Sequence, residues 1–109
     1  MKWISLDSEN QLAELVQLSY QKPQFIFKHS TRCGVSSMAM NRLERNDIGA
    51  DFYLVDVIGN RSLSNKIAEQ FDIYHESPQL LLISEGQCVF NDSHFNISSS
   101  VAEEAIKLA

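Results

Sequence analysis

The stretch Ser30-Thr31-Arg32-Cys33-Gly34-Val35-Ser36 decides how the rest of this sequence is interpreted. It follows Phe25-Ile26-Phe27-Lys28, an apolar run typical of a buried strand, and leads into a helix-like run from Ser36 to Arg45. A cysteine at such a junction lies at the positive end of the helix, where unpaired backbone N–H groups favour a thiolate over a thiol. The residue three positions after Cys33 is a serine, so the motif is C-x-x-S, half of the dithiol C-x-x-C redox motif. We therefore expect one reactive thiol that takes part in thiol–disulfide exchange.

Length and composition limit the class of protein. The 109 residues fit one domain, residues 1–109, and the net charge is −5. No run of lysine and arginine stands out, which argues against nucleic acid as a partner. No apolar stretch approaches the roughly 20 residues of a membrane span, and the start of the chain is too polar for a signal peptide. We therefore expect a monomeric cytoplasmic protein with no membrane contact, in a compartment where thiols stay reduced.

The two cysteines, Cys33 and Cys88, are far apart in the sequence and do not have zinc-site spacing, so we expect no metal site. Cys88 belongs to the apolar run Cys88-Val89-Phe90, which favours a packing role. The alternative is a resolving thiol, which would require the two Cα atoms to lie about 4.4–6.8 Å apart. The strand that carries Cys88 is expected to lie a strand or more away from Cys33, so packing is the better interpretation.

Apolar runs and turn residues predict an α/β fold with the element order β-α-β-α-β-α-β-β-α. The expected strands cover residues 3–6, 25–28, 51–57, 80–83 and 87–90. The expected helices begin at Asp7 or Ser8, near Cys33, near Ser62 and between Ser98 and Ser100. Glu85-Gly86 is a plausible two-residue hairpin turn between the last two strands. We therefore expect a mixed five-stranded sheet flanked by four helices on both faces.

Local signals predict some details of the helices. Two pairs have the spacing of capping boxes: Ser8 with Gln11, and Ser100 with Glu103. The second helix is expected to turn three apolar side chains inward: Met38, Met40 and Leu43.

The element order resembles the thioredoxin fold once two residues are added to it. Cys33 lies at the second strand-to-helix junction, and Pro78 lies just before the fourth strand. In that superfamily the matching proline is cis and faces the active cysteine. The resemblance therefore implies a cis Ser77–Pro78 bond beside Cys33.

A narrower resemblance covers nearly the whole chain. Lys28-His29-Ser30-Thr31, Cys33, Ser36 and Ser77-Pro78-Gln79 are similar to the YtxJ-like family, the monothiol bacilliredoxins. The family motif reads T-C-P-I-S, whereas Gly34 and Val35 stand here in place of Pro and Ile, which loosens the first helical turn. The resemblance implies an oxidoreductase that uses the small thiol bacillithiol as co-substrate and has no tightly bound cofactor. Its partners would be S-thiolated client proteins and a small thiol or reductase.

The candidate site residues follow from these motifs. Arg32 adds a positive charge that favours the thiolate. Ser36 is expected to donate a hydrogen bond to the thiolate, and its alternative role is to satisfy backbone groups at the helix start. We assign catalytic roles to Cys33, Ser36 and Pro78, and substrate-binding roles to Thr31, Arg32, Ser77 and Asp92. Among the nearby polar residues, His29 is expected to be a strand-end histidine rather than a base, and Asp92 and His94 are expected in a surface loop.

Two other functions remain open from the sequence. Cys33-Gly34-Val35-Ser36 is one residue away from the C-G-F-S motif of monothiol glutaredoxins, which hold an iron–sulfur cluster between two subunits with glutathione. Those proteins carry Gly-Gly-x-Asp after the hairpin, where this chain has Asn91-Asp92-Ser93-His94. The third possibility is a thioredoxin-fold adaptor without catalysis, because a fold does not fix a function. The colour of the purified protein separates the cluster carrier from the exchange enzyme.

Overall fold

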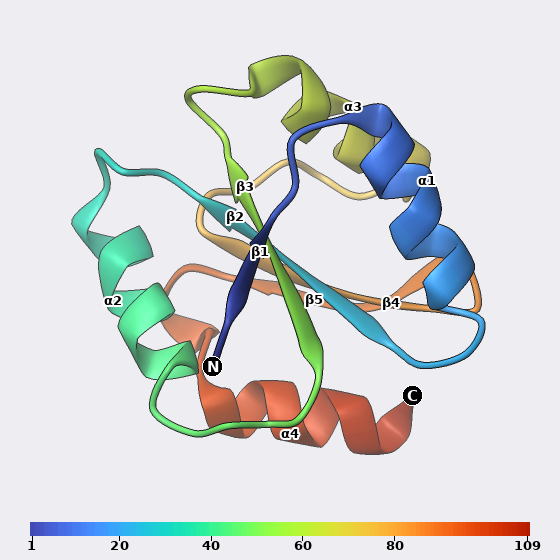
Figure 1. Ribbon diagram of the computed structural model, residues 1–109. Coiled ribbons are helices and arrows are strands. Elements are labelled where there is room, and N and C mark those ends of the chain that lie inside the picture. Colours follow the sequence, from blue (N-terminus) through green and yellow to red (C-terminus); the bar gives the residue numbers. More distant parts are fainter.

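The computed structural model describes residues 1–109. Its elements follow the expected order and add one short 3₁₀ helix near the end (Figure 1). The strands are β1 (Trp3–Ser5), β2 (Gln24–His29), β3 (Asp51–Asp56), β4 (Gln79–Ser84) and β5 (Gln87–Ser93). The helices are α1 (Glu9–Leu18), α2 (Gly34–Leu43), α3 (Arg61–Gln70), η1 (His94–Asn96) and α4 (Ser99–Leu108).

The five strands form one mixed sheet in the order β1-β3-β2-β4-β5, which confirms the predicted architecture. β1, β3 and β2 are parallel, whereas β4 is antiparallel to β2 and β5 is antiparallel to β4. The register pairs His29 with Asp56 and Lys28 with Gln79. The carboxyl end of β2 therefore lies beside the residues that precede β4, and both segments reach the same edge of the sheet.

Helices cover both faces of the sheet, two on each face (Figure 1). On one face, α1 and α3 pack over a core of Leu6, Leu12, Leu15, Ile26, Tyr53, Val55, Leu63, Ile67, Leu81 and Ile83. On the other, α2 and α4 pack over Phe25, Phe27, Ala39, Leu43, Phe52, Leu80, Leu82, Ile97, Ala102 and Ala105. The side chains of β2 alternate between these two clusters, because successive side chains of a strand point to opposite faces.

The hairpin turn and the first helix cap form at the residues that the sequence predicts. Glu85 and Gly86 have φ angles of 52° and 78°, and positive φ at both central residues is the signature of a type I′ turn. Ser8 is the N-cap of α1, and its Oγ accepts a hydrogen bond from the Gln11 N–H at 3.1 Å. The Gln11 side chain in turn accepts from the Asp7 N–H at 2.9 Å, one residue earlier than a strict capping box requires.

Three local predictions were wrong. The capping box predicted for Ser100 and Glu103 does not form, because the N-cap of α4 is Ser98, within the predicted start, and its Oγ accepts from the Val101 N–H at 3.3 Å. Met38 is exposed, because α2 buries Ser36, Ala39 and Leu43, a stripe that does not include position 38. β5 continues to Ser93, so Asp92 lies in a strand rather than in a loop.

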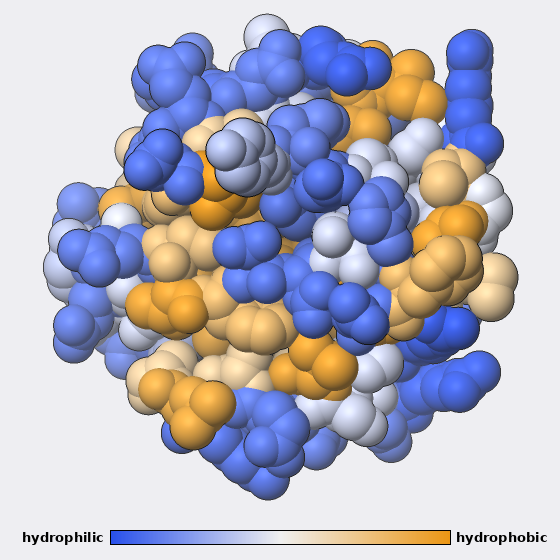
Figure 2. All heavy atoms as spheres, turned by 180° about the vertical axis from the view of Figure 1, so that it is seen from behind, coloured by the Kyte–Doolittle hydropathy of each residue, from blue (hydrophilic) through white to orange (hydrophobic).

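The surface has one apolar groove, of about 250 Å³, between β5 and α4. Apolar residues gather on the face that contains the sheet edge at β5 (Figure 2). The groove is lined by Phe90, Val101, Ala105 and Leu108, together with Ser100 and Glu104. No helix in the structure is both long enough and apolar enough to span a membrane.

Candidate active site

Cys33 is the N-cap of α2, as the strand-to-helix position predicted. Its backbone N–H donates to the Ser30 carbonyl at 3.2 Å, and its carbonyl accepts from the N–H groups of Ser36 and Ser37 at 3.1 and 3.2 Å. The backbone around the thiol is therefore held on both sides. The side chain is partly exposed and makes no capping hydrogen bond, so the sulfur is free to react at the start of the helix.

Ser36 lies in the first turn of α2 and is fully buried. Its Oγ accepts a hydrogen bond from the Ser30 N–H at 3.0 Å and lies 2.7 Å from Nδ1 of His29. These contacts join the first turn of α2 to the end of β2. The hydroxyl has no hydrogen bond to Cys33 in this structure, and its one backbone partner, the Ser30 N–H, precedes the helix rather than belonging to its start.

His29 ends β2 and is half-buried. Its ring stacks on Phe27, with ring centroids 5.9 Å apart. Burial lowers the pKa of His29, and the nearby Asp56 carboxylate partly opposes that shift. The imidazole is therefore mainly neutral near pH 7. Its Nδ1 contacts the hydroxyl of Ser36, a residue of the Cys33 motif.

The Ser77–Pro78 peptide bond is cis, and Pro78 is buried beside the end of β2. The Pro78 carbonyl accepts a hydrogen bond from the His94 N–H at 3.1 Å. The preceding residue differs, because the N–H and carbonyl of Ser77 make no hydrogen bond within the protein. Its Oγ is also buried without a partner. Ser77 therefore offers an unpaired backbone donor and acceptor, which an added extended chain can use.

Glu76 and His94 enclose this segment from the side. His94 Nε2 lies 2.7 Å from Glu76 Oε2, and both side chains are about half exposed. Because the His94 N–H also binds Pro78, one residue holds the segment on both sides of Ser77. We call this arrangement the Glu76–His94 clasp. No local sequence pattern predicts the role of Glu76, because its partner is 18 positions away.

The other predicted substrate-binding residues lie in different surroundings. Thr31 and Arg32 are exposed in the turn that leads to Cys33. Asp92 is directed elsewhere, because its Oδ1 accepts from the Ser93 N–H at 2.9 Å and from Asn96 Nδ2 at 3.2 Å. These contacts shape the connection from β5 into η1.

A buried lysine lies on the opposite face of β2 from the Phe27 and His29 rings. Lys28 is fully buried, and its Nζ donates to the Ser64 carbonyl at 2.9 Å and contacts Nδ1 of His75 at 3.1 Å. Burial lowers the pKa of Lys28 from 10.5 to about 8. Burial and the positive charges of Lys28 and Arg61 lower the pKa of His75. The cluster ties the central strand and α3 to the loop that leads to Pro78.

Cys88 lies at the other end of the sheet from Cys33. It pairs with Ile83, which in turn faces Gln24 at the start of β2. β2 is six residues long, so its two ends are roughly 17 Å apart. That separation far exceeds the Cα–Cα reach of a disulfide. Cys88 packs against the α1–α3 core and its Sγ lies 3.3 Å from the Phe90 carbonyl, so the packing interpretation holds.

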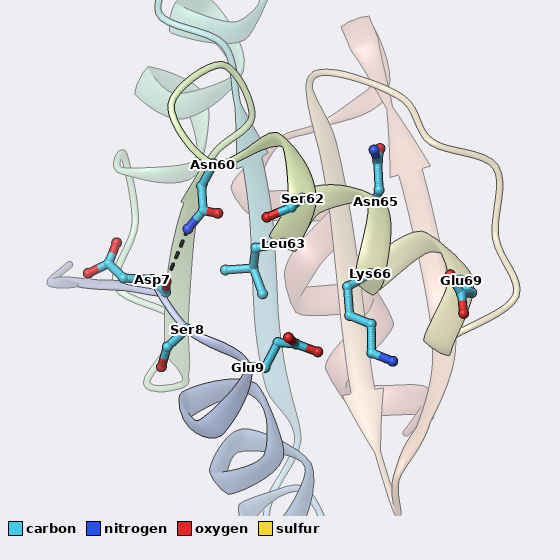
Figure 3. A pocket seen from close by; sticks show the side chains of 9 residues that line it. All are labelled: Asp7, Ser8, Glu9, Asn60, Ser62, Leu63, Asn65, Lys66 and Glu69. Carbon is cyan, nitrogen blue, oxygen red and sulfur yellow. Dashed lines mark hydrogen bonds between the residues drawn. The ribbon is translucent and has the colours of Figure 1, made fainter.

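A pocket of about 530 Å³ is separate from Cys33. It lies between the N-terminal ends of α1 and α3, where Asn60 Nδ2 donates to the Asp7 carbonyl at 3.1 Å (Figure 3). Its lining is polar and of mixed charge: Asp7, Ser8, Glu9, Asn60, Ser62, Leu63, Asn65, Lys66 and Glu69. No thiol lies in it, and no group of three or more metal-ligating side chains occurs in the structure.

Comparison with known proteins agrees with this geometry. The sequence model of the family described as monothiol bacilliredoxin BrxC matches residues 4–101, a span that includes Cys33, Ser36 and Pro78. A solved structure described as a candidate oxidoreductase with a thioredoxin fold is 31% identical, with a TM-score of 0.83. The match covers 94% of this chain and 92% of that chain.

Two thioredoxins show the same fold at lower identity. The thioredoxin of Malassezia sympodialis is 19% identical with a TM-score of 0.75, and the match covers 98% of this chain and 90% of that one. The thioredoxin of Fasciola hepatica is 18% identical with a TM-score of 0.74, and the match covers 96% and 97%. The chain therefore has the thioredoxin fold that the element order and Pro78 suggested.

Proposed function

Because the chain belongs to the monothiol bacilliredoxin family, we propose that it reduces mixed disulfides between client proteins and a small thiol through Cys33. The observation that carries this proposal is the position of the thiol. Cys33 stands at the N-cap of α2, and the C-x-x-S motif places a hydroxyl rather than a second thiol one helical turn later. A thiolate at a helix start is the nucleophile that thiol–disulfide exchange requires.

The reaction takes place in two steps. The Cys33 thiolate attacks the small-thiol sulfur of the mixed disulfide, a new S–S bond forms on Cys33, and the client leaves as a reduced thiolate. Cys33 then carries the small thiol. A second molecule of that thiol, as its thiolate, attacks the adduct, which releases Cys33 and forms the symmetric small-thiol disulfide. No internal thiol can replace that second molecule, because Cys88 lies at the far end of the sheet.

The free backbone groups of Ser77 support a docking role for this segment. An extended client segment would pair with the N–H and carbonyl of Ser77 as an added strand, next to buried Pro78. Thr31 and Arg32 would contact the substrate from the exposed turn. The Glu76–His94 clasp would hold the docking segment in place.

Family membership supports bacillithiol as the small thiol and the cytoplasm as the compartment, where thiols are kept reduced. In this proposal the protein acts as a monomer without a tightly bound cofactor. The C-G-V-S motif is also similar to that of a competing class, the iron–sulfur carriers of the glutaredoxin type. Such a carrier would be a coloured dimer, because its cluster is held between two subunits.

The test uses a peptide that carries one cysteine in mixed disulfide with bacillithiol. The native protein should release the free peptide and gain the mass of one bacillithiol, located on Cys33. Cys33→Ser should do neither, whereas Cys88→Ser should behave as the native protein does. A native protein that leaves the mixed disulfide intact, or one that is isolated brown and dimeric, would contradict the proposed function.

A further inference from the structure

We propose that His29 is a positioning residue for Cys33 that acts through the hydroxyl of Ser36, an inference that rests on the exchange function proposed above. The geometry is a short chain of groups. His29 Nδ1 lies 2.7 Å from Ser36 Oγ, and Ser36 occupies the third helical position after the N-cap Cys33. N-cap and third-position side chains face each other across the first turn of a helix. His29 is therefore one hydroxyl group away from the thiol.

The Ser36 hydroxyl has one hydrogen to donate and two lone pairs. The Ser30 N–H occupies one lone pair at 3.0 Å. While Nδ1 of His29 carries no proton, the hydroxyl hydrogen points to Nδ1 and is unavailable to Cys33. When His29 is protonated, its Nδ1–H occupies the second lone pair of Ser36. The hydroxyl hydrogen must then turn to another acceptor, and the Cys33 thiolate is the acceptor on the facing side of the turn.

Surrounding groups limit the hydrogen-bond partners that Ser36 and His29 can take. The buried Ser36 side chain excludes water as a competing partner. Phe27 stacks on the imidazole and fixes the ring plane. The ionisable groups on neighbouring elements are the Asp56 carboxylate on β3, the Cys33 thiol at the start of α2 and Arg32 in the turn between β2 and α2. Asp56 favours a protonated His29, burial opposes it, and a thiolate on Cys33 adds to the effect of Asp56.

During exchange, the hydrogen-bond partner of the Ser36 hydroxyl changes with the charge on Cys33. A thiolate is a strong acceptor, whereas a disulfide sulfur is a weak one. Protonated His29 therefore directs the hydroxyl hydrogen to the free thiolate. Once Cys33 carries the small thiol, the hydrogen returns to Nδ1 of His29 and the ring loses its proton. Because linkage is reciprocal, the chemical state of Cys33 must change the proton affinity of His29.

The first experiment measures that coupling without any substrate. Nitrogen NMR of the imidazole reports the tautomer and the titration midpoint of His29, in the free protein and after Cys33 is capped with a neutral methylthio group. At neutral pH the proton should lie on Nε2, with Nδ1 bare. Capping should lower the His29 midpoint by about 0.5–1 pH unit. In Ser36→Ala the shift on capping should be clearly smaller, because only the direct charge effect is left.

The second experiment measures reactivity. Asparagine places an amide where the imidazole has Nδ1, so His29→Asn keeps a partner for Ser36 but does not titrate, whereas His29→Leu removes the partner. At pH values below the His29 midpoint, where the protonated ring directs the Ser36 hydroxyl to the thiolate, His29→Leu should slow both exchange and alkylation of Cys33 by iodoacetamide by about tenfold. His29→Asn should recover most of that loss and should lack the step in the pH profile of the rate that follows the His29 midpoint. His75→Asn, on the other face of β2, is the matched control and should keep the step.

The two proposals fail in different ways. The positioning role is overturned, even when mixed disulfides are reduced, by a His29 midpoint that is the same in free and capped protein. It is also overturned by a His29→Leu rate that equals the native rate at pH values below that midpoint. If His29 and Cys33 are coupled but the protein reduces no mixed disulfide, the positioning role is supported and the proposed function is wrong. A proton on Nδ1 at neutral pH also overturns the inference, because Ser36 would then already accept from His29.

Discussion

The Nζ of Lys28 lies 3.1 Å from Nδ1 of His75, a contact that joins the central strand to the loop leading to Pro78. Lys28 is fully buried and has no ion-pair partner within 4.0 Å. Its hydrogen bonds to Ser64 and His75 satisfy the ammonium but do not neutralise it. A buried charge without a counter-ion costs free energy, and burial accordingly lowers the pKa of Lys28 to about 8.

This burial predicts that the contribution of Lys28 to the stability of the protein becomes more favourable as the pH rises above 8. The pKa of Lys28 is 10.5 in the unfolded chain and about 8 in the folded one, so between these values the unfolded state binds more protons. Stability then increases with pH, by an amount on the order of 3 kcal/mol across the window for this residue alone. Urea unfolding at several pH values from 7.5 to 10.5 measures the trend.

Lys28→Met isolates the contribution of Lys28, because methionine has a similar shape and no charge. The difference in unfolding free energy between native protein and variant should move in favour of the native protein as the pH rises from 8 to 10.5. The other groups that titrate in that range are common to both proteins and cancel in the difference. A difference that does not depend on pH would show that the Lys28 ammonium is stabilised in the folded protein as well as it is in water.

The Glu76–His94 clasp should affect binding more than chemistry. Glu76→Gln and His94→Gln should each raise KM for the mixed-disulfide peptide by up to about fivefold, because a half-exposed pair contributes at most about 1 kcal/mol. The value of kcat should stay within about twofold, since the two side chains bind each other and neither has a hydrogen bond to Cys33. Steady-state kinetics with the bacillithiol–peptide substrate measure both constants.

Lys107→Gln is the matched control, because it breaks the exposed Lys107–Glu104 contact of 3.9 Å on α4. It should leave both constants unchanged. If the clasp variants lower kcat and leave KM alone, the docking role of the segment is wrong and the clasp acts on the chemical step.

The two cysteines should differ sharply in reactivity. Burial raises the pKa of the Cys88 thiol, and that side chain packs against the α1–α3 core, whereas Cys33 is free at the start of α2. A disulfide reagent should therefore modify one thiol per folded chain at neutral pH and two in denaturant. Cys88→Ala should keep the exchange activity and lower the stability by about 1 kcal/mol, the cost of removing a small, partly buried group. Two fast thiols in the folded protein would contradict this assignment.

Much of the fold could be predicted because its signals are local. The apolar runs at Phe25-Ile26-Phe27 and Leu80-Leu81-Leu82 mark the buried central strands, and Glu85-Gly86 supplies the positive φ values of the hairpin. The length of β5 could not be predicted in this way. Residues 91–93 are polar, yet they pair with β4, because the strand ladder is held by backbone groups that every residue carries.

The parts of the site that the sequence did not show depend on contacts between distant residues. In the sequence, Lys28 is a polar residue at the end of an apolar run, and nothing local indicates that it is buried. Its contact with His75, 47 positions away, helps to explain how a lysine can be buried there. Ser36 was expected to bind the thiolate. Its hydroxyl instead binds His29 and Ser30, because the turn from Ser30 to Cys33 brings the end of β2 against the first turn of α2.

The last prediction concerns the position that sets the monothiol mechanism. In Ser36→Cys the new thiol would lie in the first turn of α2, where a side chain faces that of Cys33 and the two sulfur atoms come within disulfide reach. It would attack the Cys33 mixed disulfide internally, where its effective concentration far exceeds that of a free thiol. The variant should therefore release the small thiol without a second molecule and accumulate an internal disulfide.

The substitution has a cost, because it replaces a buried hydroxyl that binds Ser30 and His29, and about 1 kcal/mol of stability should be lost. Ser37→Cys is the matched control, since residue 37 is exposed and its side chain points about 100° further round the helix. Intact-mass analysis after one equivalent of mixed-disulfide substrate should show the adduct retained in native protein and Ser37→Cys, and released only in Ser36→Cys. If Ser36→Cys retains the adduct while folded, the side chains of residues 33 and 36 do not face each other. The route from His29 to the thiol through Ser36 would then lose its geometric basis as well.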